Sequence, residues 1–227
     1  MNTEHREAVE VLLADRLFIY SLMHKVFGQE PTEQLLNVLT GEMTAEALDV
    51  LGEEGNVLYK GARFLQEVAK DRKDPAFLSR LNSEFNSLFI GPLKLIAPPW
   101  ETVYIDRKEM LFQETTLKVR SFFQEYGVIP QGYPRVADDS LALELAFMAE
   151  LAARAMTAFE ERNDEELKKN LKGSDIFLEE HLLAWVPELL KRVADSETDY
   201  LYPQMTLVLD AFLKKDHEVL LEILPMV

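Results

Sequence analysis

Residues 138–160 read DDSLALELAFMAELAARAMTAFE, and this stretch decides the fold class. Apolar side chains recur in it at steps of four and three residues, the period of one helix face packed on a core. The acids and the serine before Leu141 are residues that cap helix N-termini. We therefore predict a long helix capped by Asp138 or Asp139 that buries one stripe of side chains. The stripe consists of Leu141, Leu145, Met148, Ala152, Ala155 and Phe159.

The helical period continues on both sides of this stretch, and no segment alternates strictly as a half-buried strand does. Glycine stops and proline starts mark most boundaries. We predict an all-α fold, a single domain over residues 1–227 with about nine to eleven helices. The other predicted helices cover 3–27, 31–39, 45–70 with a break at 52–55, 75–90, 107–126, 174–193 with a kink at Pro187, 200–214 and 217–224, and a polar bridge covers 161–173.

Two irregular loops interrupt the helices, near 91–106 and 127–138. The first reads GPLKLIAPPWETVYID, and its three prolines and one glycine exclude a regular helix. It is nevertheless rich in large apolar residues, so it must be pinned onto the body or onto a partner. Trp100 and Tyr104 are residue types favoured as interface anchors, and they are equally suited to plug the loop onto the bundle.

The net charge is −16, from 40 acidic and 24 basic side chains. This balance argues against nucleic acid and anionic membrane surfaces as partners, because both need exposed Lys and Arg. A cationic partner would be attracted, although the acidity could equally serve solubility alone. The start has no signal-peptide pattern, and the richest apolar run is broken by Gly91, Pro92 and Lys94. We expect a cytoplasmic protein without stable membrane insertion.

The sequence contains few residue patterns typical of catalytic sites. It contains no cysteine, no Gly-rich phosphate loop, no nucleophile elbow and no histidine pair at metal-ligand spacing. With 40 carboxylates, chance pairs are unavoidable and no general acid–base pair can be singled out. We therefore expect no enzyme activity, no cofactor and no metal. His181 and Trp185 share a helix at i, i+4 and are expected to form a core or rim contact.

Two positions near the start of the central helix stand out. The Asp138-Asp139-Ser140 run offers more polar groups than one N-cap needs, so capping and partner binding both remain open. Glu144 falls on the inward side of the apolar stripe. A carboxylate there needs a partner, and an arginine or a backbone donor is expected.

Three segments resemble the TorD/DmsD family of molybdoenzyme chaperones. EFNSLFIGPLKLIAPPWETVYID (84–106) resembles the family's signature loop, DDSLALELAFMAELA (138–152) its Asp-His helix start, and FLEEHLLAWVPELL (177–190) its late helix with His-Leu and Trp. The matches follow the family's order and spacing. Ser140 departs from the pattern, because the family often has histidine there, and a charged role at that position lapses.

The resemblance implies an all-helical, TorD-like chaperone without a catalytic site. It implies binding of a molybdenum-cofactor oxidoreductase precursor, at its twin-arginine signal peptide or as apo-enzyme, which assists cofactor insertion and delays export. It also makes a domain-swapped dimer an alternative to a monomer. Rival hypotheses are a generic acidic scaffold without such a client, and an enzyme or sensor with a pocket between helices. The expected partner-binding residues are Trp100, Glu101, Tyr104, Asp138, Asp139, Ser140 and Glu144.

Overall fold

The predicted central helix is α8 (Leu141–Glu160), and its apolar stripe is buried as expected. The six stripe residues are at most 3% exposed. Alanines in the stripe let neighbouring helices approach closely, and α8 packs along α1 (Thr3–Gly28) and α9 (Asp164–Phe177). Burial of such a stripe contributes roughly 1.5–3 kcal/mol for each large apolar side chain.

The computed structural model describes residues 3–91, 95–107, 110–130, 133 and 135–227, so Pro92 and Lys94 of the first loop lie outside it. Over these residues the chain forms eleven α-helices and no strand, in agreement with the predicted all-α class. The remaining α-helices are α2 (Glu33–Leu39), α3 (Glu42–Leu51), α4 (Val57–Asp71), α5 (Phe77–Phe85), α6 (Glu101–Ile105), α7 (Glu114–Glu125), α10 (Leu183–Ala194) and α11 (Tyr202–Ile223), with π-helical turns at Asn86–Ile90 and Leu178–Leu182 and a 3-10 turn at Leu224–Met226.

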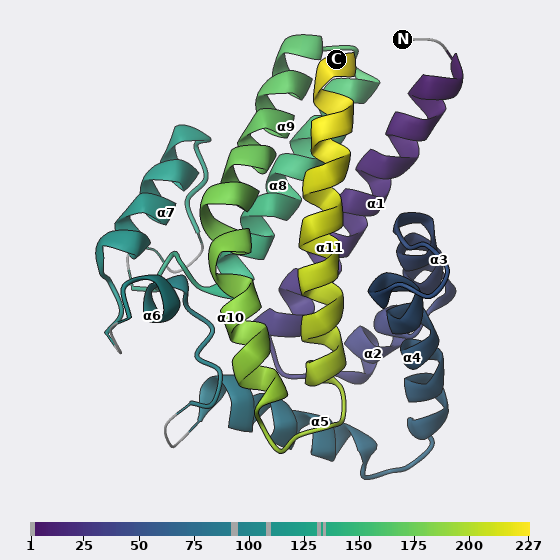
Figure 1. Ribbon diagram of the computed structural model, residues 1–227, viewed down its shortest axis with the longest axis vertical. Helices are drawn as coiled ribbons and strands as arrows, with labels where there is room; N and C mark the ends of the chain where they lie inside the picture. The colour runs from purple at the N-terminus through teal and green to yellow at the C-terminus, as the bar shows by residue number, and fades with distance from the viewer. Residues whose placement is uncertain (1–2, 92–94, 108–109, 131–132, 134) are drawn as a thin grey trace.

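Four long helices, α1, α8, α9 and α11, form the centre of the molecule (Figure 1). Helices α6 and α7 lie at one edge of this centre, and α2, α3 and α4 lie at the opposite edge. Helix α5 crosses one end, below the connection between α10 and α11. A cluster of buried apolar side chains runs from Val9 on α1 to Ile223 on α11 and joins these parts. No helix in the described part of the chain is long and apolar enough to cross a membrane.

The prediction of two C-terminal helices was wrong, because α11 continues without a break from Tyr202 to Ile223. The polar run Lys214-Lys215-Asp216-His217 looked like a connection. Asp216, however, points into the protein and is only 1% exposed, where it pairs with Arg16 of α1. The side chain that seemed to interrupt the helix therefore fixes it to the core.

Three other segments also differ from prediction. The polar bridge 161–173 is helical from Asp164, since the Asn163 side chain accepts the Glu166 N–H and caps α9. The helix predicted from residue 107 begins only at Glu114. Arg107 and Phe112 adopt left-handed backbone conformations, which interrupt a right-handed helix. The loop 91–106, expected to lack regular helix, contains the short helix α6.

Smaller shifts affect helix starts. Helix α2 begins two residues after Pro31, capped by Thr32, and α5 begins at Phe77. The Asp74 carboxylate accepts the Ala76 N–H in the turn that precedes α5. The predicted break at 52–55 is confirmed, since α3 ends at Leu51 and α4 starts at Val57. Pro187 lies inside α10, and α10 itself follows directly after the π-helical turn Leu178–Leu182.

Candidate partner-binding site

The proline-rich loop is fastened to the start of α8 through its backbone. The Glu101 N–H donates to the Asp139 carbonyl and the Leu141 N–H donates to the Pro99 carbonyl, both at 2.9 Å. These bonds place Trp100 opposite Ser140 as an isolated antiparallel bridge. Two segments that the sequence singled out separately, 97–106 and 138–144, thus form one structure.

The capping roles at this junction differ from prediction. Ser140, not Asp138 or Asp139, is the N-cap of α8, and its hydroxyl accepts the Leu143 N–H at 3.4 Å. Asp139 instead caps the neighbouring helix α6, because its carboxylate accepts the Thr102 N–H at 2.9 Å. The buried Asp139 carboxyl has a raised pKa, since burial outweighs this hydrogen bond. Asp139 therefore has a structural task in another element.

Asp138 is fully buried and paired with Arg120 of α7. The Arg120 Nε and Nη2 atoms donate to one carboxylate oxygen of Asp138 at 2.8 and 2.6 Å. Arg120 also lies over the Tyr133 ring, with its guanidinium carbon 5.1 Å from the ring centre. This pair fastens the second irregular loop to α7, and no local sequence pattern indicates Arg120 as the partner of Asp138.

Glu101 and Glu144 lie together beneath the loop. His181 Nδ1 lies 3.0 Å from a Glu101 carboxylate oxygen, and the Trp185 indole N–H donates to Glu144 at 3.0 Å. The expected partner of Glu144 was an arginine or a backbone donor, so that prediction was wrong. A core or rim contact was predicted for His181 and Trp185, and both lie in the core, 4% and 0% exposed. The i, i+4 spacing of His181 and Trp185 was the one sequence signal that these two side chains lie on the same side of a helix.

Burial and the nearby Glu101 carboxylate raise the pKa of Glu144 well above the ordinary value. The second oxygen of Glu144 has no donor in the described part of the chain. A proton on that oxygen removes the repulsion between the two carboxylates. The site is therefore built around a glutamic acid that favours its neutral form.

We predict that Glu144→Gln weakens the pH dependence of stability. Above about pH 4.3, the pKa of an unfolded glutamic acid, the folded state holds this proton and the unfolded state does not. The free energy of unfolding therefore falls as pH rises toward the folded pKa, by at most about 1.4 kcal/mol per pH unit for one group. Glutamine is neutral and can still accept the Trp185 N–H. The free energy of unfolding of the variant, relative to that of wild type, should therefore increase as pH rises.

Chemical denaturation at several pH values measures this difference. The matched control is Glu150→Gln, which changes a carboxylate on the same helix that pairs with Arg154 near the surface. The control should keep the wild-type pH slope. A Glu144→Gln slope equal to that of wild type would contradict the protonated Glu144.

The expected site residues divide by exposure. Glu101, Asp138, Asp139 and Glu144 are at most 2% exposed. Trp100, Tyr104 and Ser140 are half-buried. Only the second group therefore reaches the surface in this conformation.

Tyr104 joins this surface to the buried acids. Its ring centre lies 5.2 Å from that of Trp185, and the Arg192 guanidinium carbon lies 4.6 Å from the centre of the Tyr104 ring. An open cavity of about 690 Å³ lies beside it, lined in part by Val103, Ile105 and Arg192. Ile105 is 44% exposed, so the surface next to Tyr104 is partly apolar. The described residues hold no cluster of three or more His, Asp or Glu side chains placed for a metal ion.

The family model described as nitrate reductase delta subunit matches residues 56–191, which include the loop, the start of α8 and the helix with Trp185. The chain belongs to this family. Its resemblance to the TorD and DmsD chaperones is confirmed by relatives with those names.

Two relatives of this chain show how far the similarity extends. It is 24% identical to "Chaperone protein TorD" of Vibrio atlanticus over 90% of this chain and 94% of that protein. It is 29% identical to "Probable Tat proofreading chaperone DmsD" of Haemophilus influenzae, and the match covers 56% of each chain. A crystal structure of a candidate redox enzyme maturation protein from Archaeoglobus fulgidus is 19% identical, with a TM-score of 0.46 over 94% of this chain and 96% of that one.

Proposed function

We propose that this protein is a cytoplasmic chaperone for the precursor of a molybdenum-cofactor oxidoreductase. It binds the twin-arginine signal peptide or the apo-enzyme, assists cofactor insertion and delays export until the client has folded. Membership of the family and relatives named as Tat proofreading and TorD chaperones support this role. The protein acts by binding and not by catalysis.

One observation carries the placement of the binding site. The half-buried side chains of Trp100, Tyr104 and Ser140 stand on a loop whose backbone is bonded to the start of α8. A surface of rigid aromatic side chains loses little conformational entropy when a partner binds. The neighbouring exposed Ile105 extends the apolar part of this surface. An apolar run of a signal peptide fits such a surface.

The buried acids contribute to the same site in a different way. Asp139 and Glu101 hold the loop in place, and Asp138 is neutralised by Arg120. Negative charge on the Glu101 and Asp139 carboxylates beneath the loop favours a cationic segment above it, since a low-dielectric surrounding screens that charge poorly. In this conformation an arginine of the peptide meets their field rather than their oxygen atoms. Direct contact between arginine and Asp139 would require the loop to lift.

We expect Trp100→Ala and Tyr104→Ala each to weaken signal-peptide binding roughly 30-fold, which corresponds to about 2 kcal/mol. The reason is the loss of a large aromatic contact from a preformed surface. Fluorescence anisotropy with a labelled twin-arginine signal peptide measures the affinity. The matched control is Tyr200→Ala, which removes a tyrosine that is 45% exposed on another part of the molecule. Equal affinities for all three variants would contradict this site.

The electrostatic contribution is tested by Glu101→Gln combined with Asp139→Asn. Both replacements keep shape and hydrogen-bonding oxygens and remove charge. Wild-type affinity should fall as salt concentration rises, and the double variant should bind several-fold more weakly with a smaller salt dependence. A salt dependence equal to that of wild type would assign the attraction to other acids.

Residues 1–227 act as one domain, supported by the continuous buried cluster, and this predicts one cooperative unfolding transition. The protein is a monomer or a domain-swapped dimer, and light scattering after size-exclusion chromatography distinguishes the two.

Purification from the native host separates the chaperone hypothesis from that of a generic acidic scaffold, since only the chaperone should co-purify with a molybdoenzyme precursor.

A further inference from the structure

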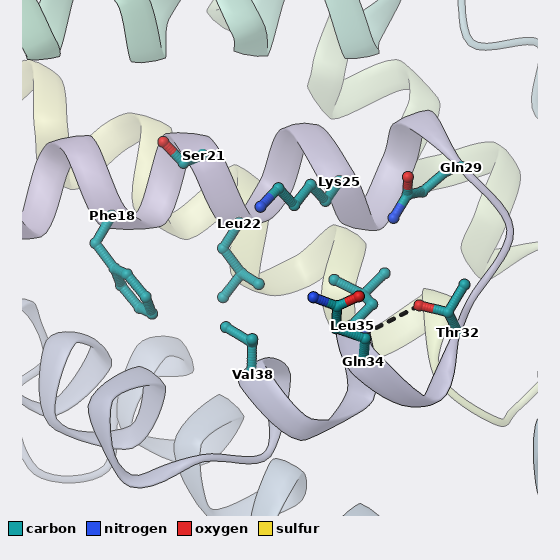
Figure 2. Close-up of a pocket in the computed structure, with 9 residues that line it drawn as sticks. All are labelled: Phe18, Ser21, Leu22, Lys25, Gln29, Thr32, Gln34, Leu35 and Val38. Atoms are coloured by element: carbon teal, nitrogen blue, oxygen red, sulfur yellow. Dashed lines mark hydrogen bonds between the residues drawn. The ribbon is translucent and has the colours of Figure 1, made fainter.

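A groove lies between α1 and α2, on the side of the molecule opposite α6 and α7 (Figure 1). Figure 2 shows Phe18 and Leu22 projecting from α1 and Val38 from α2 into the same space. Leu35 completes the apolar lining and is 5% exposed, whereas Val38 is 45% exposed. The cavity measures about 300 Å³, at the lower end of the range of ligand pockets.

The groove is preformed by local structure. The Thr32 hydroxyl accepts the Leu35 N–H at 3.1 Å and caps the start of α2 (Figure 2). This cap fixes the direction of the first turn of α2, so that the side chains of α2 that line the groove face α1. A preformed apolar surface needs little reorganisation to receive a partner.

The rim of the groove carries one charge. Its polar members include the amides of Gln29 and Gln34 and the ammonium of Lys25. In the part of the chain that the structure describes, no acid lies within ion-pair distance of Lys25. Several other lysines do have partners, such as Lys118 with Glu114 and Lys214 with Asp210. Lys25 is the one charged side chain among the described residues that line the groove, so it favours an anionic group beside an apolar one.

We infer that this α1–α2 groove is a second docking site, which binds a peptide segment that presents an apolar side chain next to a carboxylate. The apolar side chain enters the space between Leu22 and Val38, and the carboxylate meets Lys25. The amides on the rim can pair with the N–H and C=O groups of an extended peptide. The net charge of the protein repels strongly acidic segments, so a single carboxylate is favoured. This site does not depend on signal-peptide binding at Trp100 and Tyr104.

Selection from a phage-displayed library of random dodecapeptides on the full-length protein tests this inference. The enriched sequences should share an apolar residue close to Asp or Glu. The best one, synthesised with a fluorescent label, should bind Lys25→Glu and Val38→Glu at least about tenfold more weakly, because one change reverses the charge and the other places a charge in the apolar space. Both residues are exposed, and circular dichroism confirms that the variants are folded.

The matched controls are Lys60→Glu and Val50→Glu, which make the same changes at exposed positions outside the groove. They should bind the peptide like wild type, and so should Trp100→Ala. No enrichment, enriched peptides without a carboxylate, or equal binding to Lys25→Glu would overturn the inference. A concentration-dependent dimer that Val38→Glu abolishes would also overturn it, in favour of a second copy of this chain as the occupant.

Discussion

Asp216→Ala is expected to lower the free energy of unfolding by about 3–5 kcal/mol, because it leaves the buried Arg16 charge without its partner. Asp216 accepts from the Arg16 guanidinium and from the Tyr20 hydroxyl, the latter at 2.6 Å. Arg16 and Asp216 are 0% and 1% exposed, so water cannot replace the lost carboxylate. Urea denaturation followed by circular dichroism measures the change.

Two further variants make this prediction specific. Glu218→Ala removes a carboxylate from an exposed ion pair with Lys215 on the same helix, and it should change stability by less than about 1 kcal/mol. Arg16→Met combined with Asp216→Leu replaces the buried pair by apolar residues and should recover most of the loss. A double variant as unstable as Asp216→Ala would show that the cost comes from packing and not from the unpaired charge.

Glu84→Ala is expected to lower the free energy of unfolding by about 3 kcal/mol or more, since four donors, two of them buried and two partly buried, lose their acceptor together. Glu84 of α5 accepts the Thr198 hydroxyl and the backbone N–H groups of Tyr200, Leu201 and Tyr202. Tyr202 is the first residue of α11, so the carboxylate also lies at the positive end of that helix. This one side chain connects α5 to the start of α11.

Glu84→Gln and Ser83→Ala are the matched controls for this prediction. Glutamine keeps one acceptor oxygen and loses the charge, so an intermediate loss of about 1–2 kcal/mol is expected. Ser83 is an exposed neighbour whose hydroxyl bonds only within its own helix, and its replacement should change stability by less than about 0.5 kcal/mol. Thermal and urea unfolding should agree on the order of the three variants. Equal stability of all three would contradict the capping role.

The helices of the core could be predicted because their signal is local. The stripe from Leu141 to Phe159 repeats at the helical period, and every helix that buries such a stripe satisfies its own backbone hydrogen bonds. The same argument failed at 214–217, where a polar run looked like a break. What keeps that run helical is Arg16, which lies 200 positions away in the chain, and no periodicity contains that contact.

The candidate site shows the same division. The sequence singled out the loop with Trp100, the acids at 138–139 and the inward Glu144, and the structure brings all of them to one place. It could not show that Asp139 caps α6, that Glu144 meets Trp185 or that the acids are buried. Each of these depends on which elements pack against each other, and many long-range pairings are compatible with one pattern of helices.

By itself, then, the sequence determined the all-helical class, the absence of familiar catalytic motifs and the segments that carry the family's signature. Those properties follow from residue type and short-range spacing. The tertiary structure decided which acids are buried, which aromatic side chains remain at the surface and where the unpaired Lys25 meets an apolar groove. Burial and pairing change the charge and the accessibility of a side chain, and both are set by neighbours that are distant in the chain.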